Sequence, residues 1–428
     1  MAAGEAISGA VPVYEDYARC VHCGLCLNHC PTYRLWQLEA DSPRGRIRQM
    51  ILVNEGHLPL AERFVEHIDK CLDCRSCETA CPSGVEYGKL VEYARAQIAE
   101  RYRRPWGARV ARALVFRRLL PNPGRIAAVA KALRFYQRSG IQGLVRATGL
   151  LRALGLAERE RLLPKIDDSF FFGELGKTFP AAGPRRARVA FFAGCIANVT
   201  FSRLNEATIR VLTANGCEVV VPEEQFCCGA LAAHAGEREA ARELARKNLR
   251  AFGRGDFDAM VTNAAGCGST LKEYNHLFAP GEPEHAAAEA FRKLAKDVTE
   301  FLAGLGLSAK LQAIPGRVTY QDSCHLLHGQ KVREAPRQLL RAIPGVELAE
   351  MTFSDICCGS AGIYNVTETQ ASLELLEEKM KNAAATRAGI IATANPGCLL
   401  QMRAGVELHK TGQEVLHVIE LLDRALPR

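Results

Sequence analysis

The sequence predicts an α+β protein of several domains: a small helical domain rich in cysteine, a basic helical segment, and two repeated α/β domains. Two observations predict this organisation. Sixteen of the 17 cysteines fall into two patterns, each of which occurs twice. Apolar residues recur at helical spacing in the first part of the chain, whereas short β-rich runs alternate with helical stretches in the second part. We expect the four parts to span residues 1–100, 101–185, 186–312 and 313–428.

The composition is that of an ordinary globular protein and excludes several other classes. Of the 428 residues, 48% are hydrophobic and 24% are charged, which argues against disorder, collagen and coiled coils. No run approaches the roughly 20 apolar residues of a membrane span. The N-terminus lacks a basic start and contains Glu5, Glu15 and Asp16, so we do not expect a signal peptide. A cytoplasmic chain holds few disulfides, which makes metal the first candidate for so many cysteines.

The first cysteine pattern is Cys-x-x-Cys-x-x-Cys-x-x-x-Cys-Pro, which runs from Cys20 to Pro31 and again from Cys71 to Pro82. Three cysteines at steps of three do not converge from one straight helix, so we expect a loop wrapped around a cluster. In proteins with two [4Fe–4S] clusters, the fourth cysteine of such a run ligates the other cluster. Zinc is the alternative, although it favours two separated Cys-x-x-Cys pairs. We expect one cluster on Cys20, Cys23, Cys26 and Cys81, and the other on Cys71, Cys74, Cys77 and Cys30.

Residues 34–70, between the two runs, have the spacing of a helical insert, with Ile47, Met50 and Ile51 on one face. Arg44 and Arg46 in this insert are interpreted either as cations that neutralise cluster charge or as surface and packing residues.

The segment from Arg101 to Lys165 is strongly basic. It contains 16 Lys and Arg against two Glu, so its net charge is +14 and that of the remaining chain is −6. Pro121, Pro123 and Gly140 predict a division into short helices. Basic amphipathic helices favour an anionic membrane surface. An acidic partner subunit and packing on the protein core are the alternatives. Nucleic acid is disfavoured, because no helix-turn-helix, zinc-finger or RNP pattern accompanies the charge.

The second cysteine pattern is longer and its two copies lie 129 residues apart, which indicates two related domains. Its members are Cys195, Cys227, Cys228 and Cys267 in the first copy, and Cys324, Cys357, Cys358 and Cys398 in the second. A glycine follows each Cys-Cys pair. Short β-rich runs precede these cysteines, at residues 189–193, 218–221, 259–262, 318–320, 346–348 and 390–393. Helical stretches lie between or after them, at residues 204–212, 237–252, 298–302, 336–343, 370–386 and 418–422.

Alternating strands and helices predict a parallel sheet in each copy. Ligands of such sheets collect beyond the carboxyl ends of the strands, so we expect the four cysteines of each copy to meet there. Four thiolates suit a further iron–sulfur centre, zinc or a redox disulfide, and the adjacent cysteines disfavour a simple zinc site. His325 and His328 are candidate proton relays or packing residues. Cys217 is expected to be a buried structural thiol.

The two ferredoxin-type runs followed by two Cys-Cys-Gly domains resemble the iron–sulfur subunits of glycolate oxidase. The resemblance covers nearly the whole chain and includes the motifs at residues 20–26, 30–33, 42–47, 81–85, 360–362 and 395–398. It implies an electron-transfer subunit with no catalytic residue of its own. Partner subunits would carry FAD and oxidise a 2-hydroxy acid, and electrons would pass to quinone or the membrane respiratory chain. The complex would lie at the cytoplasmic, inner face of the cell membrane.

Related layouts occur in the iron–sulfur subunits of lactate-using enzymes and of anaerobic glycerol-3-phosphate dehydrogenase, which are alternative settings for the same role. The catalytic subunit of heterodisulfide reductase is also similar, which leaves a disulfide- or quinone-reducing enzyme as an alternative. The Cys-Cys-Gly domains of that subunit end in Cys-x-x-Cys. Here Cys267 is followed by Gly-Ser-Thr and Cys398 by Leu-Leu-Gln, so the fifth ligand is missing. No G-x-G-x-x-G follows a strand, so we expect no flavin or nicotinamide site on this chain.

Overall fold

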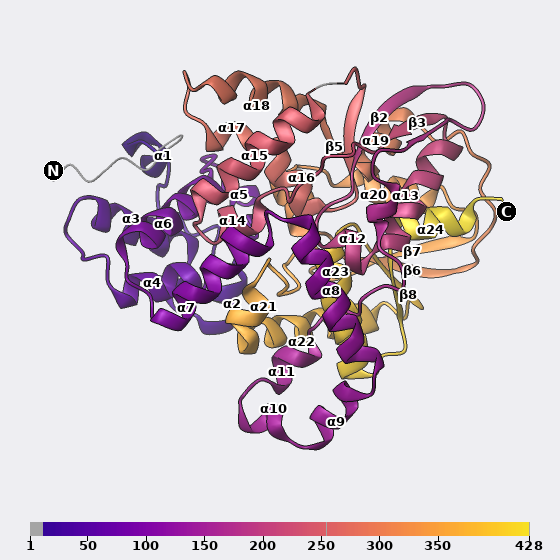
Figure 1. The fold of residues 1–428 in the computed structure, drawn as a ribbon. Helices are drawn as coiled ribbons and strands as arrows, with labels where there is room; N and C mark the ends of the chain where they lie inside the picture. Colours follow the sequence, from indigo (N-terminus) through magenta and orange to yellow (C-terminus); the bar gives the residue numbers. More distant parts are fainter. Residues whose placement is uncertain (1–11, 254, 428) are drawn as a thin grey trace.

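The computed structural model describes residues 12–253 and 255–427. Glu5, part of the stretch that we expect not to be a signal peptide, lies outside the described residues. The helical N-terminal part and the two α/β parts lie side by side, and a helical segment extends below them (Figure 1). The predicted multi-domain α+β class is confirmed. The exact boundaries stay a prediction.

The N-terminal module (residues 12–101) is helical on both sides of its cysteine runs. Its helices are α1 (Tyr14–Ala18), α2 (Pro31–Trp36), the 3-10 turn Glu39–Asp41, α3 (Pro43–Asn54), α4 (Glu62–Asp69), α5 (Ser76–Thr79) and α6 (Tyr87–Arg101). Ile47 and Met50 are buried as expected. Pro31 and Pro43 begin helices because the first helical position needs no backbone N–H. The proline after Cys30 therefore ends the ligand loop and starts α2.

The linker (residues 102–177) contains α7 (Trp106–Arg112), a π-helical turn (Ala113–Leu119), α8 (Pro123–Arg138), α9 (Ile141–Ala147), α10 (Leu150–Ala153), α11 (Ala157–Arg161) and the 3-10 turn Phe171–Glu174. Pro123 starts α8, and Gly140, with φ of +84°, precedes α9. Helix α8 spans 16 residues, so the expectation of only short helices is wrong there. Its run of alanines favours a longer helix. Helices α9 to α11 form the lobe at the bottom of Figure 1.

The first repeat (residues 186–312) has a five-stranded sheet of order β1-β3-β2-β4-β5. Its strands are β2 (Ala187–Phe192), β3 (Cys217–Val220), β4 (Ala259–Thr262) and β5 (Ala295–Asp297), which are parallel, and β1 (Thr178–Phe179), which pairs antiparallel with β3. Its helices are α12 (Ala197–Thr200), α13 (Ser202–Ala214), α14 (Ala230–His234), α15 (Arg238–Phe252), α16 (Ala265–Lys272), α17 (Tyr274–Leu277), α18 (Pro283–Leu294) and α19 (Val298–Leu305). Strand β1 was not expected, because it precedes residue 186, where the first repeat was expected to begin.

The second repeat (residues 313–427 of the described structure) has a parallel sheet of order β7-β6-β8-β9. Its strands are β6 (Gly316–Tyr320), β7 (Val346–Glu350), β8 (Ile390–Thr393) and β9 (Glu414–His417). Its helical elements are the π-helical turn His325–Gly329, α20 (Glu334–Arg341), α21 (Tyr364–Thr367), α22 (Thr369–Ala385), α23 (Pro396–His409) and α24 (Val418–Ala425). Every predicted strand and helix is present. Strands β5 and β9 were missed, since they are short, partly polar and lead directly into helices capped by Asp297 and His417.

The two repeats share one hydrophobic core. It joins Val189, Phe191 and Val219 of the first sheet with Val318 and Ile391 of the second. Helix α13 packs on α24, and α19 packs on α20. The two sheets therefore form a single unit, and the strand ends that carry the cysteines are held in a defined relation to each other.

The N-terminal module is joined to the first repeat by a buried ionic network. His234 Nδ1 lies 3.1 Å from Asp73 Oδ2 and 3.0 Å from Glu92 Oε1, and Arg75 pairs with Glu273. Burial by itself lowers the pKa of His234, but the two carboxylates outweigh this effect and raise it to about 9. The protonated imidazole therefore belongs to the network at neutral pH.

We expect Gly236→Ala to loosen this contact. Gly236 has φ of +79°, and a β-carbon there would lie 2.2 Å from the carbonyl oxygen of Arg95. Backbone strain of roughly 1–2 kcal/mol would add to a clash that no rotamer change relieves. Urea unfolding of the full chain should shift to lower denaturant concentration. Gly183→Ala is the matched control, because Gly183 has φ of +87° but no atom within 4 Å of the added carbon. Equal losses in both variants would contradict the tight contact.

Candidate metal centres

The two ferredoxin-type runs form loops of the same design. Cys20, Cys23 and Cys26 lie between α1 and α2, and the residues that flank Cys23 adopt left-handed backbone conformations. The equivalent residues of the second run do the same, with φ of +52° at Asp73 and +60° at Arg75. Non-glycine residues rarely adopt this conformation, so a surrounding constraint must hold them there. These turns let cysteines spaced by three residues face a common centre.

One cavity gathers the cysteines predicted for the second cluster. Cys30, Cys71, Cys74 and Cys77 all line it, although Cys30 belongs to the first run. All four are buried. Burial and the neighbouring thiols raise the pKa of Cys74 and Cys77 well above the usual range. Thiolates at this place therefore need a positive charge nearby, such as a metal centre or a buried cation.

Arg46 is the buried cation beside this cavity. It is 1% exposed, and its guanidinium donates to Thr32 Oγ1 at 3.1 Å and pairs with Asp41 at 3.3 Å. Thr32 Oγ1 in turn lies 3.2 Å from Cys30 Sγ. Of the two roles considered for Arg46, its position next to the cysteines supports charge neutralisation. Arg44 is more exposed and pairs with Glu39.

The cysteines predicted for the first cluster lie at the surface of the module. Cys20, Cys26 and Cys81 pack against the same apolar cluster, and Cys23 is exposed. Burial raises the pKa of Cys20, and the nearby Cys81 raises it further. Burial also raises the pKa of Cys26 to about 11. Cys81 of the second run thus adjoins the first run.

The four cysteines of the first repeat meet at the carboxyl ends of its strands, where the α/β pattern places them. Cys195 follows β2, Cys227 and Cys228 follow β3, and Cys267 lies in the first turn of α16. Cys228 Sγ and Cys267 Sγ are 3.2 Å apart. The hydrogen bond that joins Cys195 and Cys227 raises the pKa of Cys195 and lowers that of Cys227. Leu120, Pro123 and Ile126 of the linker line a small cavity beside this site.

The cysteines of the second repeat converge in the same way. Hydrogen bonds connect Cys324 with Cys357, and Cys358 with Cys398. Asn395 Nδ2 donates to Cys398 Sγ at 3.5 Å. Gly359 of the Cys-Cys-Gly motif has φ of +90°, and a β-carbon there would lie 2.6 Å from the carbonyl oxygen of Ser372. The motif therefore needs glycine for the turn and for close approach to α22.

Cys217 lies apart from all four thiol sites. It is fully buried in β3, and burial raises its pKa to about 11. This environment agrees with the expected structural thiol.

Contacts link the four thiol sites in series. Cys20 and Cys26 of the first ferredoxin-type site share one apolar cluster with Cys71 and Cys77 of the second. Cys74 of the N-terminal module packs with Cys324 and Cys357 of the second repeat in one apolar cluster. Asn395, which contacts Cys398, also accepts a hydrogen bond from the backbone N–H of Gly266, next to Cys267. The second ferredoxin-type site therefore meets the second repeat, which in turn meets the first.

His325 and His328 bridge the second repeat and the N-terminal module. His325 Nε2 lies 3.0 Å from the carbonyl oxygen of Asp73, and His328 Nδ1 lies 2.8 Å from Thr79 Oγ1. Burial lowers the pKa of His325 to about 4, so its ring is neutral. These contacts give both histidines a positioning role in the interface. Sequence spacing contained no signal for this role.

Asp73, Glu92 and His234 bring three potential metal-ligand atoms within 4.8 Å of one another. Arg75 lies 3.4 Å from Glu92, and Arg95 lies 3.9 Å from Asp73. Because cations already face both carboxylates, this group is an ionic network and not a metal site.

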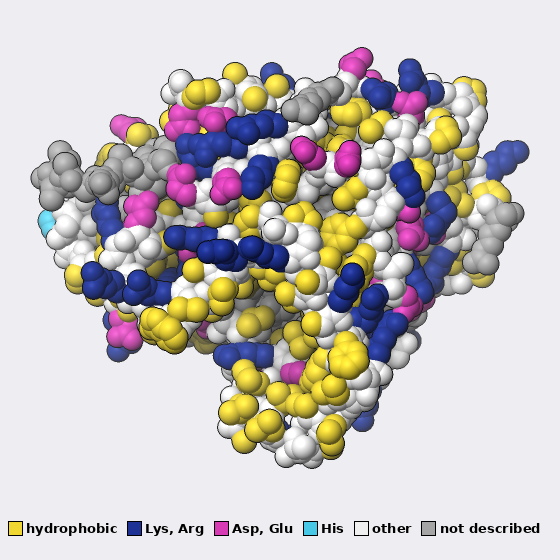
Figure 2. Space-filling model, in the orientation of Figure 1, with side chains coloured by type: hydrophobic (Ala, Val, Ile, Leu, Met, Phe, Trp, Pro, Cys, Tyr) yellow, Lys and Arg dark blue, Asp and Glu magenta, His cyan; other side chains and the backbone are white. Residues whose placement is uncertain are grey.

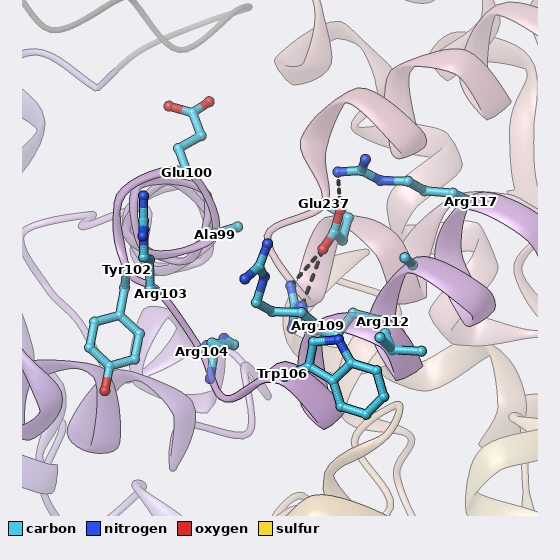
Figure 3. A pocket seen from close by; sticks show the side chains of 12 residues that line it. Ala99, Glu100, Tyr102, Arg103, Arg104, Trp106, Arg109, Arg112, Arg117 and Glu237 are labelled. Carbon is cyan, nitrogen blue, oxygen red and sulfur yellow. Dashed lines mark hydrogen bonds and ion pairs between the residues drawn. The ribbon is translucent and has the colours of Figure 1, made fainter.

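A basic cleft of about 660 Å³ lies at the start of the linker, and its lining contains no cysteine. Figure 3 shows Arg103, Arg104, Arg109, Arg112 and Arg117 around it, beside Trp106. Glu237 pairs with Arg112 at 3.1 Å and with Arg117 at 3.7 Å. The excess of guanidinium groups suits an anionic ligand or surface.

Comparisons with known proteins agree with this organisation. A 4Fe-4S dicluster domain family matches residues 16–85, and a cysteine-rich domain family matches residues 189–272 and 318–403. Residues 107–163 match the linker region of the glycolate oxidase iron-sulfur subunit. The chain is 43% identical to a probable glycolate oxidase iron-sulfur subunit of Bacillus subtilis, over 95% of this chain and 93% of the relative. It is 32% identical to the glycolate oxidase iron-sulfur subunit of Escherichia coli, over 96% and 94%. Lactate utilization protein A of Oceanobacillus iheyensis is 30% identical over 55% of this chain.

Crossed ligation of the two N-terminal sites can be tested with four variants. Cys23→Ala and Cys74→Ala supply reference EPR spectra, because each removes a ligand from the middle of one run. If ligation is crossed, the spectrum of Cys30→Ala should resemble that of Cys74→Ala, and Cys81→Ala should resemble Cys23→Ala. Cys217→Ala is the control and should retain both signals. The opposite pairing of spectra would contradict the assignment.

Proposed function

The chain belongs to the family of glycolate oxidase iron–sulfur subunits, and we propose that it carries electrons toward quinone in the membrane. The electrons come from a flavin-containing partner that oxidises a 2-hydroxy acid. The observation that carries this proposal is the continuous series of thiol sites. It runs from the surface site at Cys23, through the buried site at Cys74, to Cys357 of the second repeat. Adjacent redox centres are the structural requirement of an electron-transfer subunit.

In this proposal two [4Fe–4S] clusters occupy the N-terminal module. The first is held by Cys20, Cys23, Cys26 and Cys81, and the second by Cys71, Cys74, Cys77 and Cys30. The shared cavity of the last four supports the crossed assignment. The two Cys-Cys-Gly sites hold a further iron–sulfur centre or act as redox thiols, since their adjacent cysteines do not suit simple tetrahedral zinc.

Electrons enter at the first cluster. Cys23 is exposed, and its neighbours Val21 and Leu25 are 68% and 58% exposed. The cysteines of the second site are all buried. Because electron transfer falls steeply with distance, a donor protein that covers Val21 and Leu25 reaches the first cluster before any other centre.

Flavin is assigned to the partner by the chemistry of the reaction. Oxidation of a 2-hydroxy acid removes two electrons, in the usual route with a hydride, whereas a [4Fe–4S] cluster accepts one electron at a time. A flavin accepts the pair and passes it on singly. The partner therefore selects the substrate, and a lactate or glycerol-3-phosphate enzyme would use the same arrangement on this chain.

The linker supplies a surface for peripheral attachment at the inner face of the membrane. Among the residues that the structure describes, 21 large apolar side chains are exposed. Eleven of them belong to the linker: Trp106, Val110, Leu114, Val129, Phe135, Ile141, Leu144, Leu150, Leu154, Leu156 and Leu163. Figure 2 shows apolar side chains gathered on the lower lobe with Lys and Arg beside them. This combination is typical of helices that lie in the membrane interface. Within residues 12–253 and 255–427, no helix has both the length and the apolar composition to cross a bilayer.

A disulfide-reducing enzyme is the second candidate. It is favoured by the 3.2 Å separation of Cys228 Sγ and Cys267 Sγ, which brings two thiols together. It is disfavoured by the missing fifth cysteine of both repeats. Disulfide reductase activity of the chain alone would support this second function.

The proposed function predicts that the cluster-loaded chain alone does not oxidise glycolate or lactate with a dye acceptor. Addition of the flavin-containing partner should allow transfer to quinone. Cys23→Ala and Cys74→Ala should abolish that transfer while substrate still reduces the flavin. Cys217→Ala is the control and should transfer electrons normally. Substrate oxidation by the flavin-free chain would overturn the proposal.

Membrane attachment predicts that the chain sediments with anionic vesicles and is released by high salt. Each basic residue near such a surface contributes about 1 kcal/mol, and the Debye length falls to about 3 Å at 1 M salt. Leu144→Gln should weaken vesicle partition at least tenfold, because burial of a leucine stabilises by about 1.5–3 kcal/mol. Leu408→Gln is the control, since Leu408 is exposed outside the linker. Sedimentation that ignores salt and Leu144 would indicate partner docking or internal packing instead.

A further inference from the structure

We propose that a cavity between the N-terminal module, the linker and both repeats is the binding site for the ring of a quinone. This inference rests on the proposed function and extends it by naming where the two-electron acceptor binds. The cavity has a volume of about 280 Å³. An apolar cavity of about 150 Å³ holds a benzene ring, so the space accommodates a substituted benzoquinone ring.

The walls of the cavity combine apolar surface with charged and polar side chains, among them Asp69, Arg95, Arg104, Arg112 and Glu368. Leu72, Leu231, Ala235, Ala361 and Ile363 supply the apolar part. They come from the N-terminal module and from both repeats, so the cavity exists only where these three parts meet.

Three residues that line the cavity have a buried polar atom, exposed by less than 1 Å², that lacks a hydrogen-bond partner in the described structure: Tyr364 Oη, His234 Nε2 and Arg104 Nε. Tyr364 is only 4% exposed, so more than nine-tenths of its surface is shielded from water. An unpaired buried polar group costs about 1–3 kcal/mol, and a ligand that accepts a hydrogen bond removes this cost. His234 Nδ1 already faces Asp73 and Glu92, which leaves its Nε2–H as a donor. Quinone carbonyl oxygens are acceptors and suit Tyr364 Oη and His234 Nε2 as donors.

The cavity lies beside the electron-carrying cysteines. Cys71 lines both this cavity and the cavity of the second cluster. The ring of Tyr364 packs with Cys74 and Cys357, between the second ferredoxin-type site and the second repeat. A ring in contact with Tyr364 therefore lies next to the second cluster.

The reaction at this site balances with the centres already assigned. A quinone accepts two electrons and two protons to form a hydroquinone. Two reduced [4Fe–4S] clusters held by the ferredoxin-type cysteines would supply one electron each, which gives the two electrons that the quinone needs. The protons come from water through the side of the cavity where Gly362 and Thr367 are exposed. His234 and Tyr364 hold the two carbonyl oxygens in place as they gain charge.

The same cavity adjoins the start of the linker, near Trp106, the first exposed apolar residue of the proposed membrane surface. Arg104 and Arg112 line it, and both also line the basic cleft of Figure 3. A quinone that leaves the bilayer beside the linker therefore meets this cavity.

Calorimetric titration of the cluster-loaded, oxidised full chain with duroquinone tests the site directly. Tyr364→Phe removes only a hydroxyl that has no partner, and it should weaken binding about fivefold. Leu231→Trp fills the cavity and should abolish saturable binding. Tyr17→Phe is the control, because Tyr17 is a buried tyrosine outside the cavity whose hydroxyl accepts a bond from Asn54. Absence of binding to the unaltered chain, or equal binding to all variants, would overturn the inference.

A second measurement separates this site from the electron-transfer function. The dithionite-reduced chain is mixed with duroquinone or with ferricyanide, and the recovery of cluster absorbance is followed. Tyr364→Phe and Leu231→Trp should slow oxidation by duroquinone and leave oxidation by ferricyanide unchanged. If both acceptors are slowed equally, the substitutions act on the clusters and the quinone site is wrong. Clusters that ferricyanide cannot oxidise would instead contradict the proposed function, while the titration still decides the binding site.

Discussion

The arrangement of the thiol sites depends on the ionic network that joins the N-terminal module to the first repeat. Asp73 lies between Cys71 and Cys74 in sequence, so the network holds the ligand loop itself. Buried ion pairs contribute little net stability after desolvation, but removal of one partner leaves an uncompensated charge. The network therefore acts mainly to specify one orientation. Without that orientation, the second ferredoxin-type site would not meet Cys357 of the second repeat.

Buried thiolates impose a second demand, which is compensating positive charge. Arg46 meets this demand beside Cys30 and Cys71. Lys379 is 2% exposed, and its Nζ donates to the carbonyl oxygen of Ser354 near the second Cys-Cys-Gly site. Burial lowers the pKa of Lys379, and the nearby Cys358 opposes this change.

Much of the fold was predictable because its signals are local. The β-rich runs before Cys195 and Cys324 are apolar enough to identify strands, and the 129-residue offset identifies the duplication. Strands β5 and β9 were missed because their sequences, Ala-Lys-Asp and Glu-Val-Leu-His, lack strand periodicity, and the sheet edge completes them. The convergence of cysteines within each repeat followed from sheet geometry. The contacts of His234, His325 and Tyr364 depend on docking between parts of the chain, which no local pattern describes.

The exposure of Cys23 has a consequence for the durability of the protein in air. Cysteine oxidation follows exposure and thiolate character, so the surface site is the one that oxidants reach first. The buried sites at Cys74 and Cys357 are shielded by the surrounding protein. The site at which the proposed function has electrons enter is therefore also the site that oxidants reach first. A bound partner that covers Val21 and Leu25 would shield it, so assembly of the complex also protects its most oxygen-sensitive part.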